Sequence, residues 1–195
     1  MSGDPADNGT VSDIANELDG AIERARAGDP RGFELLYRTL GDSVAGYLRA
    51  RSVSDPEGIA DDVFLRAFRT IHTFQGDTRR FRAWIFTIAH HAAVDDVRHR
   101  RRRVQEAPLS RAPDAAGGDV EDEVIANLAH ERVRALVSGL SAEQRDVLML
   151  RVVADLSISE TAAVLGKSYE AVKALQRRGL NALRRTVSSQ ERAPR

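Results

Sequence analysis

Apolar residues recur at helical spacing along most of this chain, and no stretch alternates between apolar and polar residues as a half-buried β-strand does. The clearest sets are Leu18, Ile22 and Ala25; Phe33, Leu36, Tyr37 and Leu40; and Phe81, Trp84, Ile85, Ile88 and Ala92. The helix breaker Gly28-Asp29-Pro30 separates the first set from the second. The pattern therefore predicts an all-α protein.

Short polar motifs predict where several of these helices begin. Asp55-Pro56 has the order of an N-cap followed by a first-turn proline. Ser141-Ala-Glu-Gln144 and Ser157-Ile-Ser-Glu160 both fit the capping box, in which the first and fourth residues satisfy each other's backbone N–H groups. We expect a helix to begin at each of these motifs.

The helical periodicity fails in two places, and these divide the chain. Residues 1–12 are small and polar, which predicts a disordered N-terminus. Residues 104–122 are rich in Pro, Ala and Gly, which predicts a flexible linker. The expected architecture is two small helical domains, at residues 13–103 and 123–187, followed by a polar tail at 188–195.

Composition narrows the class of protein. The 195 residues include no cysteine, which excludes disulfides, cysteine zinc sites, iron–sulfur clusters and thiol catalysis. No apolar run approaches the roughly 20 residues that a membrane helix needs. The polar, acidic N-terminus lacks the features of a signal peptide. We therefore expect no membrane insertion and a cytoplasmic location.

The formal net charge is zero, but the charges are segregated along the chain. Residues 1–30 and 113–131 are mainly acidic, whereas residues 79–103 and 167–185 are mainly basic. Two basic blocks separated by an acidic stretch indicate two surfaces that face a polyanion, one on each domain. The alternative is that each block is an ordinary solvated helix face.

Residues 157–184 have the layout of a helix, a short turn and a second helix. Gly166 can adopt the positive φ that such a turn needs, and Ser168 can cap the second helix. The second helix carries two opposite stripes, which are Val172, Leu175, Gly179 and Leu183 on one side and Lys173, Arg177, Asn181 and Arg184 on the other. One packed face and one basic face are typical of a recognition helix in the DNA major groove. An αα-hairpin with a basic outer face is the alternative.

Aromatic and basic residues are interleaved in the first domain, between residues 74 and 98. Unpaired bases stack on aromatic rings while guanidinium groups follow the phosphate backbone, so this composition suits a segment that captures flipped bases. The competing interpretation is that Phe81, Trp84 and Ile85 belong to the hydrophobic core. Phe74 lies in a predicted loop and is the aromatic residue that we expect to be exposed.

No constellation for catalysis stands out. His91 and Asp95 are one helical turn apart, but no third ligand accompanies them, so we predict no metal site. The sequence has no nucleophile motif, no glycine-rich phosphate loop and no acid–base pair. We therefore predict a protein that is not an enzyme and that needs no cofactor or small-molecule substrate. A nuclease that uses Asp61, Asp62, Asp95 and Asp96 is a distant alternative.

At these residues the sequence resembles bacterial RNA polymerase sigma factors of the extracytoplasmic-function (ECF) group of the sigma-70 family. In the first domain the resemblance rests on Phe33-Glu-Leu-Leu-Tyr37, on residues 55–68 and on Phe81-Arg-Ala-Trp-Ile-Phe-Thr-Ile-Ala89. In the second domain it rests on Leu140-Ser-Ala-Glu-Gln-Arg-Asp-Val-Leu148 and on the helix-turn-helix. The order and spacing of these segments are more specific than any one of them.

The resemblance implies that the protein binds core RNA polymerase, directs it to promoters through the −35 and −10 elements, and helps to melt the −10 region. The residues implied in binding the clamp helices of the large subunit are Asp55, Glu57, Asp61, Asp62, Phe64 and Arg66. Those implied at the −10 element are Phe74, Arg79, Arg80, Arg82, Trp84, His90, His91 and Arg98. Those implied at the −35 element are Ser168, Tyr169, Glu170, Lys173, Gln176, Arg177 and Arg178.

The resemblance also implies further partners. The polymerase flap is the expected partner of the second domain, and an anti-sigma factor, which can hold the protein near the membrane, is a further expected partner. His90-His91 and Asp61 depart from the residues usual in the group. A stand-alone helix-turn-helix repressor or activator is the alternative function; it explains residues 157–185 but not the aromatic and basic segment at 74–98. An anti-sigma or scaffold protein is a third alternative, and it needs no basic recognition stripe.

Overall fold

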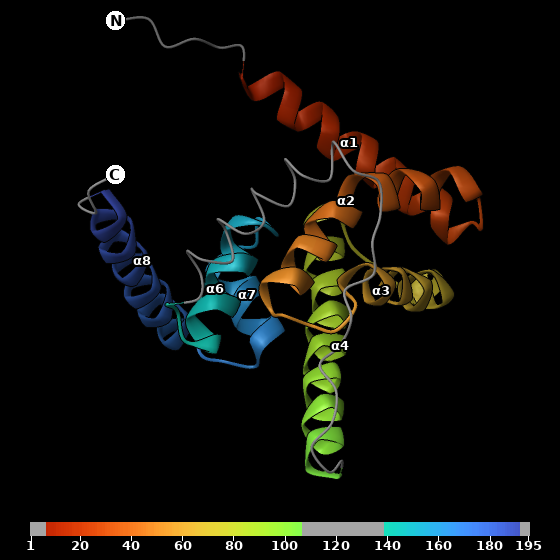
Figure 1. Cartoon of the computed structure of the whole chain (residues 1–195). Coiled ribbons are helices and arrows are strands. Elements are labelled where there is room, and N and C mark those ends of the chain that lie inside the picture. Colours follow the sequence, from red (N-terminus) through yellow and green to blue (C-terminus); the bar gives the residue numbers. More distant parts are fainter. Residues whose placement is uncertain (1–6, 107–138, 192–195) are drawn as a thin grey trace, which may run out of the picture.

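Figure 1 shows the computed structural model of the chain, which describes residues 7–106 and 139–191. The elements in order are α1 (Asp7–Arg26), α2 (Pro30–Ala50), α3 (Pro56–Thr70), the short 3₁₀ helix η1 (Ile71–Thr73), α4 (Thr78–Glu106), α6 (Ala142–Val152), α7 (Ile158–Leu165) and α8 (Tyr169–Glu191). The described residues contain no β-strand. The prediction of an all-α protein is confirmed.

Helices α1 to α4 form the first module. Helix α1 packs along α2, α2 along α3, and α3 along α4. The core between them combines aliphatic and aromatic side chains, and Tyr47, Phe64, Phe81 and Phe86 are almost fully buried in it. Tyr47 and Phe86 meet edge to face, with ring centroids 5.8 Å apart. Each large apolar side chain buried in this way stabilises the fold by about 1.5–3 kcal/mol relative to an exposed one.

Helices α6 to α8 form the second module. Val147 of α6, Ala162 of α7 and Val172 and Leu175 of α8 make its own small core. The backbone of α8 comes close to α6 at Gly179, where an added Cβ would lie 2.8 Å from the side chain of Leu148. A larger residue at this crossing would force the Leu148 side chain to move.

The predicted helix starts are confirmed. Asp55 caps α3 by accepting a hydrogen bond of 3.0 Å from the N–H of Gly58. Ser141 and Ser157 each make a full capping box, at the starts of α6 and α7 respectively. These caps satisfy N–H groups that have no partner within the helix.

Three predicted boundaries differ from the structure. Helix α1 begins at Asp7, so the prediction of disorder over residues 1–12 is wrong for residues 7–12. Helix α4 runs to Glu106, into the predicted linker, and α8 runs to Glu191, into the predicted tail. Extending a formed helix adds one hydrogen bond per residue without a new nucleation step, which favours longer helices than the apolar pattern alone indicates. Residues 107–122 of the predicted linker lie outside the described residues.

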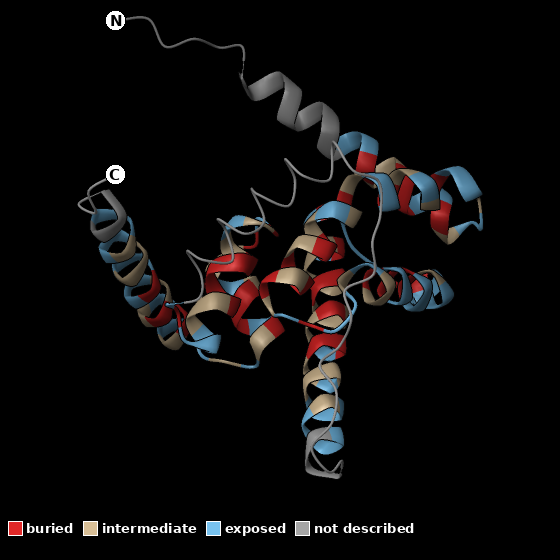
Figure 2. Ribbon diagram, viewed as in Figure 1, coloured by how far each residue is buried: buried red, intermediate tan, exposed pale blue. Residues whose placement is uncertain are grey.

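The two modules pack against each other. Helix α7 lies along α4, and α6 contacts α2. The buried apolar cluster of the first module also includes side chains of the second, which are Met149, Leu150, Ala154, Leu156 and Val164. Figure 2 shows buried residues on the facing sides of these helices. One hydrophobic core therefore continues from the first module into the second.

Candidate nucleic-acid interface

Helix α8 carries the basic face that the sequence predicts. Lys173, Arg177, Asn181 and Arg184 are exposed, whereas Val172, Leu175 and Gly179 on the opposite side are buried. A shallow hollow of about 620 Å³ runs along the basic side and is lined by Lys173, Gln176, Arg177 and Leu180 among others. We call the exposed side chains Lys173, Arg177, Asn181 and Arg184 the recognition face. A protruding helix of this kind fits the DNA major groove, which is about 12 Å wide.

The turn before α8 holds this helix in place. Gly166 ends α7 with a φ of 61°, in the left-handed region that favours glycine. The Ser168 hydroxyl then accepts a hydrogen bond of 3.2 Å from the N–H of Ala171. Lys167 in the turn forms an ion pair of 2.5 Å with Glu143, and this hydrogen bond lowers the pKa of the Glu143 carboxyl. Tyr169 and Glu170, at the start of α8, are both exposed.

The aromatic residues at the start of α4 form a compact cluster. Phe74 stacks on Trp84, with ring centroids 5.1 Å apart, and meets Phe81 edge to face at 5.5 Å. Phe74 is 9% exposed, so the expectation that it is exposed in its loop is wrong. The cluster buries Phe74 because the first turn of α4 brings Phe81 and Trp84 back over the loop. Trp84 itself is half-buried and keeps part of its ring at the surface.

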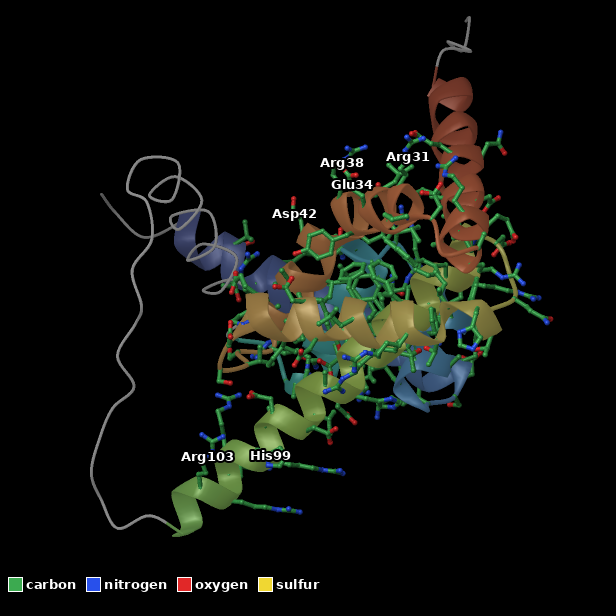
Figure 3. All side chains as sticks on the ribbon, turned by 90° about the vertical axis from the view of Figure 1, so that its right-hand side faces the viewer. Arg31, Glu34, Arg38, Asp42, His99 and Arg103 are labelled. Carbon is green, nitrogen blue, oxygen red and sulfur yellow. The ribbon has the colours of Figure 1, made fainter. Side chains whose placement is uncertain are left out.

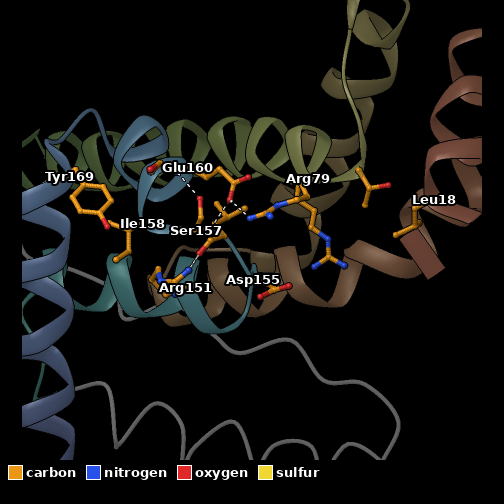
Figure 4. A pocket seen from close by; sticks show the side chains of 12 residues that line it. Leu18, Arg79, Arg151, Asp155, Ser157, Ile158, Glu160 and Tyr169 are labelled. Atoms are coloured by element: carbon orange, nitrogen blue, oxygen red, sulfur yellow. Dashed lines mark hydrogen bonds and ion pairs between the residues drawn. The ribbon is translucent and has the colours of Figure 1, made fainter. Parts of the chain in front are cut away.

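The arginines of this segment differ in their surroundings. Arg80 is exposed, Arg82 is half-buried, and Arg79 makes an ion pair of 3.5 Å with Glu160 of α7. Arg79 and Arg82 lie beside a cavity of about 830 Å³ between the modules (Figure 4). The side chains of Ser157, Glu160 and Tyr169 line the same cavity from the second module. Arg79 and Arg82 therefore lie beside the second module, although the Arg79 side chain remains 69% exposed.

His90 is half-buried beside polar groups of the first module. Its Nδ1 lies 2.8 Å from the hydroxyl of Tyr47 and 3.4 Å from a guanidinium nitrogen of Arg51. Burial, together with the positive charge of Arg51, lowers the pKa of His90 to about 4. The ring is therefore neutral at pH 7, and its Nδ1 accepts hydrogen bonds from these two donors.

His91 and Arg98 are exposed on the same helix. They line a hollow of about 430 Å³ whose other wall is the end of α7 and the turn, residues 163–166. Beyond Arg98, α4 projects away from the rest of the molecule, and Figure 3 shows His99 and Arg103 on this projecting end. The basic block at 98–103 is therefore an exposed helix end, apart from Arg100, which bonds the backbone oxygen of Ser52 at 2.6 Å.

Helix α3 presents an acidic face. Asp62 and Arg66 are exposed, and Asp61 accepts a hydrogen bond of 2.7 Å from the Tyr37 hydroxyl, which raises the pKa of that tyrosine. Glu57 pairs with Arg49 at 2.6 Å. Phe64 is 2% exposed and packs in the core, so the sequence-based assignment of Phe64 to a binding surface is wrong for this conformation. Its spacing from Ala60 and Ala67, which are also buried, places it on the inner side of α3.

Sequence analysis missed a buried polar cluster at the contact between the modules. Arg51, which directly follows α2, forms an ion pair with Asp146 of α6, and each side chain is only 12% exposed. Burial raises the pKa of the Asp146 carboxyl, and the positive charge of Arg51 opposes this shift. The sequence gives little sign of this pair, because Asp146 follows the polar residues Glu143, Gln144 and Arg145 and directly precedes the apolar run Val147–Leu150. In the part of the chain that the structure describes, no three His, Asp or Glu side chains are grouped as metal ligands.

Comparison with known proteins assigns both modules. The model of Sigma-70 region 2 matches residues 36–103, and the model of Sigma-70 region 4 matches residues 135–185. The ECF RNA polymerase sigma factor BldN of Streptomyces coelicolor is 34% identical over 185 residues, which cover 93% of this chain and 69% of BldN. The ECF sigma factor SigD of Mycobacterium tuberculosis is 31% identical over 175 residues, which cover 86% of this chain and 82% of SigD.

A solved structure agrees with these matches. The structure of CnrH in complex with the cytosolic domain of CnrY superposes with a TM-score of 0.65 and 25% sequence identity, and it covers 88% of this chain and 98% of CnrH. No helix among the described residues is long and apolar enough to cross a membrane. The two sigma-70 regions, in this order on an all-α fold, establish that the chain belongs to the extracytoplasmic-function RNA polymerase sigma factors, which initiate transcription at specific promoters.

Proposed function

We propose that this sigma factor reads the −35 element through the recognition face of α8. The observation that carries the proposal is the division of α8 into a buried apolar stripe and an exposed basic stripe. Arg177 and Lys173 can reach guanine edges or phosphates, and Gln176 can pair with adenine. Ser168 and Tyr169, at the start of α8, and the neighbouring Glu170 and Arg178 complete the contact surface.

The −10 element is the ligand of α4. The exposed groups Arg80, His91 and Arg98 follow one strand of DNA, and the exposed part of the Trp84 ring offers a platform for an unpaired base. Phe74 supports that platform from below, since the two rings are stacked at 5.1 Å. Phe74 is thus a positioning residue here, and it does not touch DNA itself.

Core RNA polymerase binds the acidic face of α3, through Glu57, Asp61, Asp62 and Arg66. Asp55 acts through the cap that fixes the start of this helix. The polymerase flap binds the second module. An anti-sigma protein is the further partner, a proposal supported by the relative CnrH, which has been solved in complex with the cytosolic domain of CnrY. The protein works in the cytoplasm without a cofactor and has no catalytic activity of its own.

Run-off transcription tests this function directly. Core polymerase is incubated with a pool of genomic fragments, with and without the protein. Discrete transcripts that need both components support the proposal, and their start sites identify the two promoter elements. A protein that footprints a duplex site alone, and yields no transcript with core polymerase, would act as a stand-alone repressor or activator instead. Divalent-metal-dependent cleavage of the fragments would overturn the non-enzymatic assignment.

A further inference from the structure

Two side chains on the later part of α4 hold the loop between α2 and α3. Asp96 accepts hydrogen bonds from both the N–H and the hydroxyl of Ser54, at 3.1 and 2.5 Å. Arg100, one helical turn further along α4, pairs with Asp96 at 2.9 Å and donates a hydrogen bond of 2.6 Å to the backbone oxygen of Ser52. We call Ser54, Asp96 and Arg100, together with the backbone of Ser52, the clasp. Ser54 and Asp96 are 42 positions apart, so no local pattern requires this contact.

The clasp is a specific contact rather than a loose surface pair. The Asp96 side chain is only 13% exposed, and carboxylates are rarely so buried unless they are paired. Ser52 has a φ of 55°, in the left-handed region that favours glycine. Val53, between the two serines, is buried in the apolar core. A residue keeps such a backbone conformation only where its surroundings determine it, so these contacts set the path of the loop.

The loop leads directly into the helix that we assign to core polymerase. Asp55, the N-cap of α3, is the residue after Ser54. The other end of α3 continues through η1 and a short loop into the start of α4, and the two helices pack against each other. Helices α3 and α4 are thus joined twice, by the chain at one end of α3 and by the clasp at the other. Two separated points of attachment resist a rotation of one helix against the other that a single point permits.

The clasp and the groups proposed to face DNA lie on opposite sides of α4. Arg98 is two positions from Asp96 and two from Arg100, which corresponds to a rotation of about 200° around a helix. His91 is seven positions before Arg98, close to two full turns, so these two exposed groups share a side. The clasp therefore holds α4 from behind and leaves His91 and Arg98 facing outward.

We propose that Asp96 is a positioning residue for promoter opening, which acts through the clasp to hold His91 and Arg98 at a fixed place relative to α3. In the complex, core polymerase holds α3 and the DNA strand must meet α4. Any movement between the two helices therefore displaces the DNA-binding groups from the strand, and small displacements of this kind lower rates strongly. This inference rests on the proposed function, in which α3 binds core polymerase and α4 binds the −10 element.

Two alanine variants of the full chain test this role. Asp96→Ala removes the carboxylate, whereas Ser54→Ala removes the hydroxyl but keeps the N–H that donates to Asp96. Alanine is the strongest helix former, so α4 itself is not weakened at position 96. A fluorescent base analogue in the −10 region of a promoter mapped by run-off transcription reports opening by the holoenzyme. We expect Asp96→Ala to slow opening roughly tenfold, and Ser54→Ala to slow it by a smaller factor.

The affinity of each variant for core polymerase is the second measurement. The exposed groups Glu57, Asp62 and Arg66 of α3 are the same in both variants, so we expect the parental affinity. Fluorescence anisotropy of the labelled protein measures it. Slower opening at unchanged affinity identifies positioning, because a general loss of structure would lower both.

Two further variants are the controls. Ser54→Thr keeps both the hydroxyl and the N–H that reach Asp96, so it should open the promoter at the parental rate. Glu34→Ala removes a carboxylate from an exposed position of the same module, where the contact with Arg38 spans 4.0 Å, and should also open at the parental rate. Far-UV circular dichroism at the assay temperature verifies that each variant is folded.

Amide hydrogen exchange of Ser54 tests the clasp without polymerase or DNA. Its N–H donates to Asp96, so exchange should be faster in Asp96→Ala than in the parental protein, and unchanged in Glu34→Ala. Equal exchange in the parental protein and Asp96→Ala overturns the clasp. Faster exchange with parental opening overturns the positioning role, and so does a core affinity that falls as far as the opening rate. A parental protein that opens no promoter with core polymerase overturns the proposed function and this role, while the exchange result still decides whether the clasp forms.

Discussion

The two faces that we propose to read DNA, one on α8 and one on α4, have different surroundings. On α8, the recognition face is exposed along its length, and the packing side of the helix turns inward. On α4, the exposed groups His91 and Arg98 look across a hollow at the second module, and Arg79 is already engaged with Glu160. The face proposed to read the −35 element is therefore exposed along its length, whereas part of the face proposed to read the −10 element lies beside the second module.

The difference follows from how each helix is used for packing. Helix α8 packs on α6 and α7 with one stripe, so its other stripe is left over. Helix α4 contacts α1, α2 and α3 of its own module and also α7 of the other. A helix that packs against several others exposes little of its surface, and for α4 the exposed part also depends on its contact with α7. The exposed face of α8 therefore follows from its own sequence pattern, whereas that of α4 depends on the packing of both modules.

The largest effect is expected from a substitution that disrupts the aromatic cluster at the start of α4 and leaves α8 intact. Phe81 is 1% exposed at the centre of the aromatic cluster, so Phe81→Ala leaves a cavity there. We expect a loss of about 3–5 kcal/mol in the free energy of unfolding, measured by urea denaturation. Leu65→Ala, at an exposed position on α3, should cost far less and serves as the control. A loss below about 1 kcal/mol in Phe81→Ala would contradict the assignment of Phe81 to the core.

The comparison also predicts that the exposed face responds to mutation in the free protein. Arg177→Ala should weaken binding to the −35 duplex by about 1–3 kcal/mol if the guanidinium reads a base edge. Arg69→Ala removes the same charge from an exposed position on α3 and is the matched control. Fluorescence anisotropy over a series of salt concentrations measures both. A loss that is uniform over all DNA sequences, with a shallower salt dependence, would identify Arg177 as a phosphate contact instead.

The helix-turn-helix could be predicted closely from the sequence because its signals are local. Each signal lies within the short segment that it predicts. These signals are the capping box at Ser157, the left-handed turn at Gly166 and the two stripes of α8. Phe74 was placed wrongly for the opposite reason. Its burial depends on Trp84, ten positions along the chain, folding back over a loop whose own composition suggests exposure.

The contact between the two modules could not be predicted from the sequence, because it joins residues that are far apart along the chain. The hydrogen bond from Arg145 to Ala50 spans 95 positions, and no periodic pattern reports on such a pair. Phe64 shows the limit of a resemblance as well. The family motif suggests a binding residue, but the positions of Ala60 and Ala67 place its ring on the buried side of α3.

A smaller effect is expected at the turn that orients the recognition face. Gly166 has a φ of 61°, so Gly166→Ala should destabilise the protein by about 1–2 kcal/mol. Gly41→Ala is the informative counterpart, because Gly41 lies within α2 and an added Cβ there meets only the Tyr37 ring at 3.7 Å. That substitution should stabilise the protein by roughly 0.5–1 kcal/mol through helix propensity. Thermal unfolding measures both, and equal signs would contradict the role of the left-handed turn.

The smallest expected effect comes from His90 of α4, whose protonation makes the stability of the protein depend on pH. The pKa of His90 is lowered to about 4 in the folded protein, from an ordinary value of 6.5 in an unfolded chain. Between these values the unfolded chain binds more protons, so stability rises with pH across this window and falls as pH drops through it. Because the ring is partly exposed, solvent screening reduces the effect, and we expect about 1 kcal/mol or less.

Burial is the largest cause of the lowered pKa of His90, and the charges of Arg51, His91 and Lys167 lower it further. The Tyr47 hydroxyl lies 2.8 Å from its Nδ1. Asp146, whose pKa is raised by burial, acts in the opposite direction as pH falls, so the His90 contribution must be isolated by substitution. His90→Asn should flatten the dependence of melting temperature on pH between 6.5 and 4, whereas His99→Asn, at an exposed position of the same helix, should leave that slope unchanged. If His90→Asn keeps the parental slope, the protonation of the half-buried imidazole is not coupled to folding. The two faces would then not differ in this electrostatic property.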